Sequence, residues 1–143
     1  MTSAAIAARL GGAEVLHHAI ESDLDLLQLL RDGLPASAVD FLVGQGALTA
    51  EELHSLVIPR RTLALRRQQK QTLTPEESDR VARVARVLAM AEETFADGDR
   101  SARWLRKPNR ALAGQVPLQL LASELGGRMV EQALGRIAHG IFA

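Results

Sequence analysis

The clearest structural signal in this sequence is the start of one long helix at Thr74. The run Thr74-Pro75-Glu76-Glu77 combines a side chain that can cap a helix, a proline suited to the first helical position and a glutamate that can complete a capping box. Apolar residues then recur at helical spacing: Val81, Val84, Ala85, Leu88, Ala91 and Phe95. The pattern predicts a helix of about five turns, which would organise much of a 143-residue chain.

Shorter helices are predicted on both sides of this segment. Capping residues and prolines place their starts at Ser22, Pro35, Thr49, Pro59, Asp99, Pro117 and Ser123. In the helix after Ser22, we expect Leu26, Leu27 and Leu30 to share the buried face. Residues 1–20 are expected to form only a loose helix or an arm. Good helix formers far outnumber β-branched and aromatic residues, so the expected fold class is all-α.

The charges lie in four blocks of alternating sign, although the formal net charge is zero. Residues 1–56 hold two basic and eight acidic residues, whereas residues 57–71 hold five basic residues and no acid. Residues 72–99 are again acidic, and residues 100–143 hold seven basic and two acidic residues. Neutrality argues against a protein that coats nucleic acid or membrane, but the blocks indicate local basic patches.

The first basic block fits a helix-turn-helix. Two short helices, 49–56 and 59–67, would flank a tight turn at Val57-Ile58. Four apolar side chains have the spacing that would lock the two helices together: Leu53, Leu56, Ile58 and Leu63. The alternative is an ordinary helix with a solvated basic face. Val57 stands where many such turns have glycine, which places the strength of DNA binding in question.

The candidate DNA contacts follow from this arrangement. Arg60, Arg61 and Thr62 lie near the start of the second helix, where base contacts usually arise. Further along, Arg66, Arg67 and Lys70 are expected along the phosphates.

Catalytic and metal-binding signals are weak. The sequence has no cysteine, and its adjacent histidines, His17 and His18, point to different faces of any helix. There is no phosphate-binding or dinucleotide-binding glycine motif, and the Gly126-Gly127 pair favours close helix packing instead. We therefore expect no enzyme activity, no cofactor and no metal ion. We find no signal peptide and no apolar run long enough to span a membrane, so a cytoplasmic protein without a membrane partner is expected.

The second basic block contains a turn-rich segment with the only tryptophan in the sequence, Trp104. The simplest interpretation is a small core in which Trp104 packs beneath the loop. The segment nevertheless ends in an apolar tail after a predicted helix stop at Gly140, beside basic residues, which is typical of a partner-binding edge.

The same segment resembles the toxin-binding domain of Xre/MbcA/ParS-type antitoxins over roughly residues 76–143. The resemblance rests on a spaced set of residues: Trp104, Pro108, Asn109, Leu112, Gly114, Pro117, Leu121 and Gly126. In that family an Xre-like helix-turn-helix precedes the toxin-binding part. With this resemblance we expect three parts: an amino-terminal extension (1–20), a DNA-binding region (21–71) and a domain for toxin binding and dimerisation (74–143). The long helix links the last two.

The resemblance also implies a type II antitoxin that dimerises within a hetero-oligomeric complex. Such proteins occlude the active site of an NAD-consuming RES-domain toxin and often repress their own operon by binding operator DNA. For the toxin contact we favour a carboxy-terminal surface made of Arg128, Arg136, His139, Gly140, Ile141, Phe142 and Ala143. Two alternatives stay open from the residues: a stand-alone dimeric helix-turn-helix repressor, and a helical adaptor with no role in nucleic-acid binding.

Overall fold

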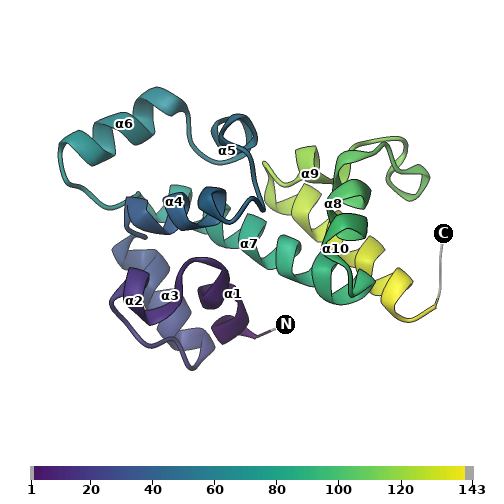
Figure 1. Ribbon diagram of the computed structural model, residues 1–143, viewed down its shortest axis with the longest axis horizontal. Helices are drawn as coiled ribbons and strands as arrows, with labels where there is room; N and C mark the ends of the chain where they lie inside the picture. Colours follow the sequence, from purple (N-terminus) through teal and green to yellow (C-terminus); the bar gives the residue numbers. More distant parts are fainter. Residues whose placement is uncertain (1, 141–143) are drawn as a thin grey trace.

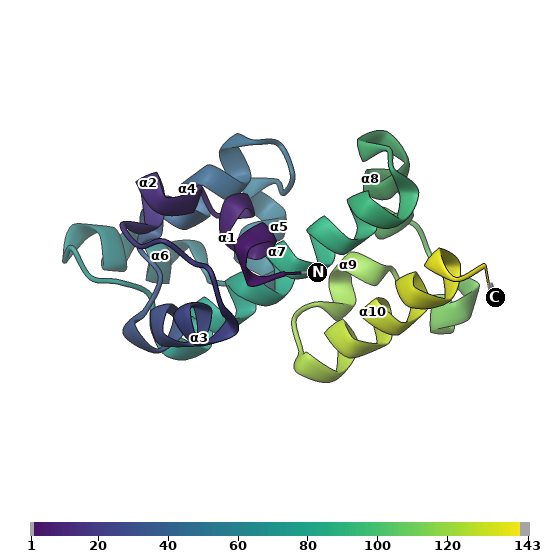
Figure 2. The same ribbon diagram turned by 90° about the horizontal axis from the view of Figure 1, so that it is seen from below.

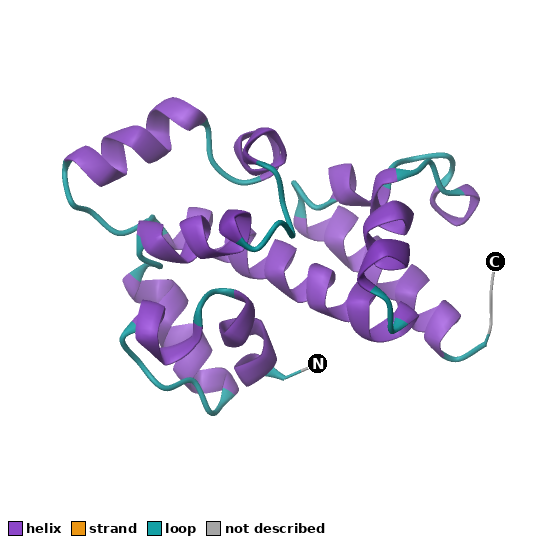
Figure 3. Ribbon diagram, viewed as in Figure 1, coloured by secondary structure: helices purple, strands orange, loops and turns teal. Residues whose placement is uncertain are grey.

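The computed structural model describes residues 2–140, and every regular element in that range is helical (Figures 1 and 3). The expected all-α fold class is confirmed. The elements are α1 (Ser3–Arg9), α2 (Gly12–Leu16), α3 (Asp23–Asp32), α4 (Ala36–Gly44), α5 (Ala50–Leu56), α6 (Arg60–Gln68), α7 (Pro75–Phe95), α8 (Gly98–Arg106), the short 3-10 helix η1 (Arg110–Leu112), α9 (Pro117–Leu120) and α10 (Glu124–Ala138).

The predicted long helix is α7, and it runs through the centre of the molecule (Figure 1). Thr74 Oγ1 accepts a hydrogen bond from the Glu77 amide, and the Glu77 carboxylate accepts one from the Thr74 amide, which confirms the capping box. Its amino-terminal half packs against α3 and its carboxy-terminal half against α8 and α10 (Figure 2). The predicted apolar face is confirmed, because Val81, Val84 and Ala85 are fully buried. Both halves of the protein therefore share one helix.

Residues 1–20 are not a loose arm, and that expectation is corrected here. They form α1 and α2, and their apolar side chains Ile6, Leu10 and Leu16 are buried in the common core. Arg9 on α1 also forms an ion pair with Glu92 on α7. Helices this short have little stability of their own, so burial against α7 is what holds them.

Two boundary details differ from the sequence-based expectation. Asp97, rather than Asp99, caps α8, because its carboxylate accepts hydrogen bonds from the amides of Asp99 and Arg100 at 2.9 and 3.2 Å. Pro59 is the N-cap residue of α6 and not its first helical residue.

The buried face of α3 also differs. Leu26 and Leu29 are buried and Leu30 is half-buried, whereas the side chain of Leu27 is 42% exposed. The three predicted leucines include the adjacent pair 26 and 27, which cannot both face α7 from one helix. The packing against α7 selects the set that is spaced by three and four residues.

Ser123 caps α10 as predicted, and the glycine pair behind it permits close packing. A Cβ atom on Gly126 would overlap the carbonyl oxygen of Leu120, and one on Gly127 would lie 2.8 Å from Cδ of Arg83 on α7. The start of α10 thus lies against α9 at a distance that only glycine allows at Gly126, whereas the Arg83 side chain next to Gly127 could move aside.

Candidate functional site

The helix pair α5–α6 forms where the helix-turn-helix was predicted: α6 lies at the outer edge of the amino-terminal half, and α5 lies between α6 and α9 (Figure 1). All four residues expected to lock the pair together are buried: Leu53, Leu56, Ile58 and Leu63. Thr49 and Glu52 form the predicted capping box at the start of α5.

The turn between these helices does not require glycine. Val57 has φ −118°, which any residue adopts, and its side chain is buried. Its carbonyl oxygen accepts a hydrogen bond from Arg80 Nε on α7 at 2.8 Å. The turn is therefore fixed by packing and by Arg80, so Val57 in place of the common glycine is compatible with a well-formed helix-turn-helix.

Three of the predicted DNA contacts lie together at the start of α6. Arg60 and Arg61 are exposed and Thr62 is half-buried. Among the side chains of residues 2–140, neither guanidinium has a carboxylate within ion-pair distance. Two unneutralised positive charges at an exposed helix start are well placed to meet the phosphate backbone or base edges of DNA.

Arg66 has a different environment from its predicted phosphate neighbours. Its Nε and a terminal nitrogen donate to the two carboxylate oxygens of Glu77 at 3.1 and 3.0 Å, and its side chain is 19% exposed. Glu77 therefore both caps α7 and holds the end of α6. The sequence predicts only the capping role of Glu77, because nothing in a spacing of eleven residues indicates that a turn brings Arg66 and Glu77 together.

The other two predicted phosphate contacts lie beyond Arg66 and are exposed. Arg67 forms an ion pair with Asp40 on α4. Lys70 follows the end of α6 in a left-handed conformation, with φ +53°. The six candidates thus fall into two groups. Arg60, Arg61 and Thr62 form no ion pair among the described residues, whereas in the second group Arg66 and Arg67 are paired with acidic residues.

Glu77 gives α7 a stability that depends on pH. Burial alone would raise the pKa of this carboxyl, but hydrogen bonds from Arg66 and Thr74, and the charge of Arg66, lower it overall. A lowered pKa in the folded state stabilises the fold above the unfolded-state pKa, and the contribution is lost as pH falls through the folded-state pKa.

We expect Glu77→Gln to be less stable than the wild type at pH 7 and to approach it below about pH 4, since protonation removes the same charge from the wild type. Urea unfolding of both proteins across this range measures the difference. A stability difference that stays constant with pH would show that the charge of Glu77 contributes nothing.

The residues that carry the family resemblance build the core of the carboxy-terminal half. Trp104 packs against Phe95 at the end of α7, with the ring centroids 5.8 Å apart. Asn109 caps η1 through a 2.9 Å hydrogen bond from the Ala111 amide, after Pro108 has ended α8. The remaining members are buried or shape turns: Leu112, Pro117, Leu121 and Gly126 are buried, and Gly114 has φ +81°. Most of this set thus has a packing, capping or turn-forming role, and half-buried Trp104 packs against the end of α7.

The predicted partner surface runs along α10 from Arg128 to the end of the helix. The Arg128 side chain is 61% exposed and lies 3.7 Å from Glu124. About two and three turns further on, Arg136 and His139 line a shallow hollow of about 310 Å³ with Gln132 and Gly135. Gly140 ends the helix with φ +73°. The predicted contacts Ile141, Phe142 and Ala143 lie outside the described residues.

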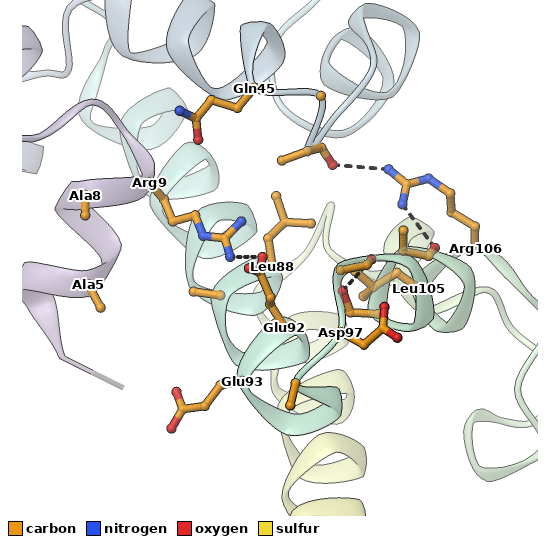
Figure 4. Close-up of a pocket in the computed structure, with 17 residues that line it drawn as sticks. Ala5, Ala8, Arg9, Gln45, Leu88, Glu92, Glu93, Asp97, Leu105 and Arg106 are labelled. Carbon is orange, nitrogen blue, oxygen red and sulfur yellow. Dashed lines mark hydrogen bonds and ion pairs between the residues drawn. The ribbon is translucent and has the colours of Figure 1, made fainter.

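A larger open groove of about 940 Å³ lies between the two halves, lined by α1, α7, α8 and the segment after α4 (Figure 4). Glu92, Glu93 and Asp97 bring acidic side chains to it.

In the part of the chain that the structure describes, no group of three or more histidine, aspartate or glutamate side chains is placed to hold a metal ion. No helix in that part is both long and apolar enough to cross a membrane.

Comparison with known proteins assigns both halves. Residues 25–86 match the family model of the antitoxin Xre-like helix-turn-helix domain, and residues 90–140 match that of the antitoxin Xre/MbcA/ParS C-terminal toxin-binding domain. The two matches meet inside α7.

Three curated relatives resemble most of the chain. A protein named "Antitoxin Xre" from Pseudomonas putida is 38% identical over 121 residues, which span 85% of this chain and 76% of the relative. A protein of the same name from Photorhabdus laumondii is 33% identical over 115 residues, or 79% of this chain and 78% of the relative. A "Prs ADP-ribosylating antitoxin" from Sphingobium sp. is 26% identical over 134 residues, or 85% of this chain and 83% of the relative. With its exposed basic helix-turn-helix and its toxin-binding fold on one shared helix, this chain belongs to the Xre antitoxin family.

Proposed function

We propose that this protein is the antitoxin of a type II toxin–antitoxin system whose toxin is an NAD-consuming RES-domain protein. In this proposal the carboxy-terminal half binds the toxin and occludes its active site, while α5–α6 binds the operator of the same operon and represses it. The protein acts as a homodimer within a hetero-oligomeric complex in the cytoplasm and has no catalytic role. The match of residues 90–140 to a toxin-binding domain carries the proposal.

Exposed side chains along α10 are our candidates for the toxin contact. An enzyme that binds the anionic dinucleotide NAD needs positive groups in its cleft, and a blocking partner must either seal that cleft or occupy it. In this proposal Arg128, Arg136 and His139 contact the toxin around the mouth of that cleft, and residues 140–143 help to seal it. The name of the Sphingobium relative supports a connection to NAD, because ADP-ribosylation uses NAD as its donor.

Growth rescue tests the toxin half of the proposal. Expression of the RES-domain toxin should stop growth, and co-expression of the full chain should restore it. We expect Arg128→Ala with Arg136→Ala to weaken rescue by roughly tenfold in the antitoxin expression required, since two exposed charged contacts are removed. Arg103→Ala with Arg110→Ala removes the same charge from exposed positions on α8 and η1 and should rescue like the wild type. Equal rescue by both double variants would reject the α10 surface.

The chain end has its own prediction. Deletion of residues 140–143 removes the proposed tail contact, and we expect weaker neutralisation in the same growth assay. Unchanged rescue would show that residues 140–143 do not contribute to neutralisation. It would not contradict a toxin contact through α10.

A further inference from the structure

A single side chain makes the polar contact between the carboxy-terminal half and the helix-turn-helix. Arg106 on α8 donates to both carboxylate oxygens of Glu52 on α5, at 2.9 Å each. It also donates to the carbonyl oxygens of Ala47 and Ala102 at 3.2 and 3.1 Å (Figure 4). Within residues 2–140, no other side-chain hydrogen bond or ion pair joins residues 98–140 to residues 45–71.

Open space flanks this contact on both sides. Arg106 lines the groove of about 940 Å³ next to α1 and α7, and it also lines a second cleft of about 370 Å³ between α5 and α9. Apolar packing between α5 and the carboxy-terminal half is therefore interrupted on either side of the ion pair. Arg106 is thus the side chain that holds α5 to α8 through polar contacts at this point.

Glu52 transmits the position of Arg106 to the DNA-binding helix. Its carboxylate caps the start of α5 by accepting a hydrogen bond from the Thr49 amide at 2.9 Å. Arg106 therefore binds the same carboxylate that caps α5. The tight, buried turn at Val57 and Ile58 then joins α5 to α6 with little freedom. A guanidinium that binds a carboxylate through two parallel hydrogen bonds fixes orientation as well as distance.

We propose that Arg106, although it belongs to the toxin-binding half, is a positioning residue for DNA recognition: through Glu52 it sets the angle at which α6 meets the operator. The inference rests on the proposed operator binding. It predicts that loss of Arg106 lowers specificity for the operator and leaves charge-driven binding to other DNA unchanged, because Arg60 and Arg61 keep their charges.

The test compares the full-length wild type with Arg106→Met, which keeps most of the side-chain stem and removes the charge. Affinity is measured for a duplex covering the segment upstream of the gene and for a shuffled duplex of the same composition. We expect the preference for the upstream duplex to fall roughly fivefold in Arg106→Met, with unchanged affinity for the shuffled duplex. A loss of folded protein would lower both affinities equally and leave the preference unchanged, so the ratio separates positioning from stability.

Two further variants sharpen the result. Arg103→Met, one turn earlier on α8 at an exposed position, removes the same charge and should retain the wild-type preference. Glu52→Gln keeps an oxygen to cap α5 but removes the charged partner, and we expect it to reproduce the loss; adding Arg106→Met to it should cause little further change. Trp104 fluorescence shows whether each variant is folded. If Arg106→Met is not folded, the DNA preference of Glu52→Gln tests the inference in its place.

If both Arg106→Met and Glu52→Gln prefer the upstream duplex over the shuffled duplex as strongly as the wild type does, the inference is overturned. The proposed repression would not be affected by that result. A wild-type chain with no preference for the upstream duplex would instead contradict the proposed repression, and the inference would fall with it.

Discussion

Replacing Arg60 and Arg61 together with alanine is expected to weaken binding to the DNA upstream of the gene by about 100-fold. Both side chains lie exposed at the start of α6 without a carboxylate partner among the described residues. Each can therefore bind DNA without first breaking an internal ion pair. Toxin neutralisation should be unaffected, because the proposed toxin surface is on α10.

The salt dependence of binding provides the physical readout. The slope of log affinity against log salt concentration should become shallower by about 0.9 for each phosphate contact that is lost. Arg103→Ala with Arg110→Ala, which removes two exposed arginines elsewhere, is the charge-matched control and should retain both affinity and slope. If the Arg60/Arg61 variant binds as well as this control, another element contacts the DNA.

The second large effect is on stability. Gly126→Ala should destabilise the fold by about 3 kcal/mol, because the new methyl group would overlap the backbone oxygen of Leu120, which cannot rotate away as a side chain could. For a chain of this size the expected fall in Tm is about 10 °C. Thermal unfolding followed through Trp104 measures it in the half of the protein that contains the substitution.

Gly135→Ala is the matched control within the same helix. A Cβ atom at Gly135 meets no neighbour within 4 Å, so alanine should be neutral or stabilising by up to about 1 kcal/mol through its better helix propensity. Equal loss of stability in both variants would show that the close approach of α9 and α10 is not what requires Gly126.

Local signals predicted most of the helix boundaries. Ser22, Thr49, Thr74 and Ser123 each cap the helix that follows, because capping depends on residues only two or three positions apart. The locking residues of α5–α6 were equally predictable, since helical spacing and a tight turn define their common face. The resemblance to the antitoxin family rested on turns and caps of the same local kind.

Pairings between distant residues could not be predicted in this way. Arg106 and Glu52 are 54 positions apart, and only the packing of α5 beside α8 brings them together. The two short amino-terminal helices carry no strong periodic pattern in the sequence. They are stabilised by tertiary burial of residues such as Ile6 and Leu10, which local spacing does not reveal. In the sequence, Arg66 cannot be distinguished from its basic neighbours on α6. The chain turn after α6, however, brings Glu77 beside it, and the Arg66 guanidinium donates to the Glu77 carboxylate. Tertiary contacts thus decide which arginines are open to a ligand.

Inhibition of NAD consumption by the purified RES-domain toxin tests the central claim most directly. If the antitoxin occludes the active site, the full chain should abolish NAD consumption, and the antitoxin concentration needed for half-inhibition should rise as NAD concentration is raised. Arg128→Ala with Arg136→Ala should shift this curve to higher antitoxin concentrations, whereas Arg60→Ala with Arg61→Ala should not. An uninhibited toxin, or inhibition that does not depend on NAD concentration, would contradict occlusion by the carboxy-terminal half.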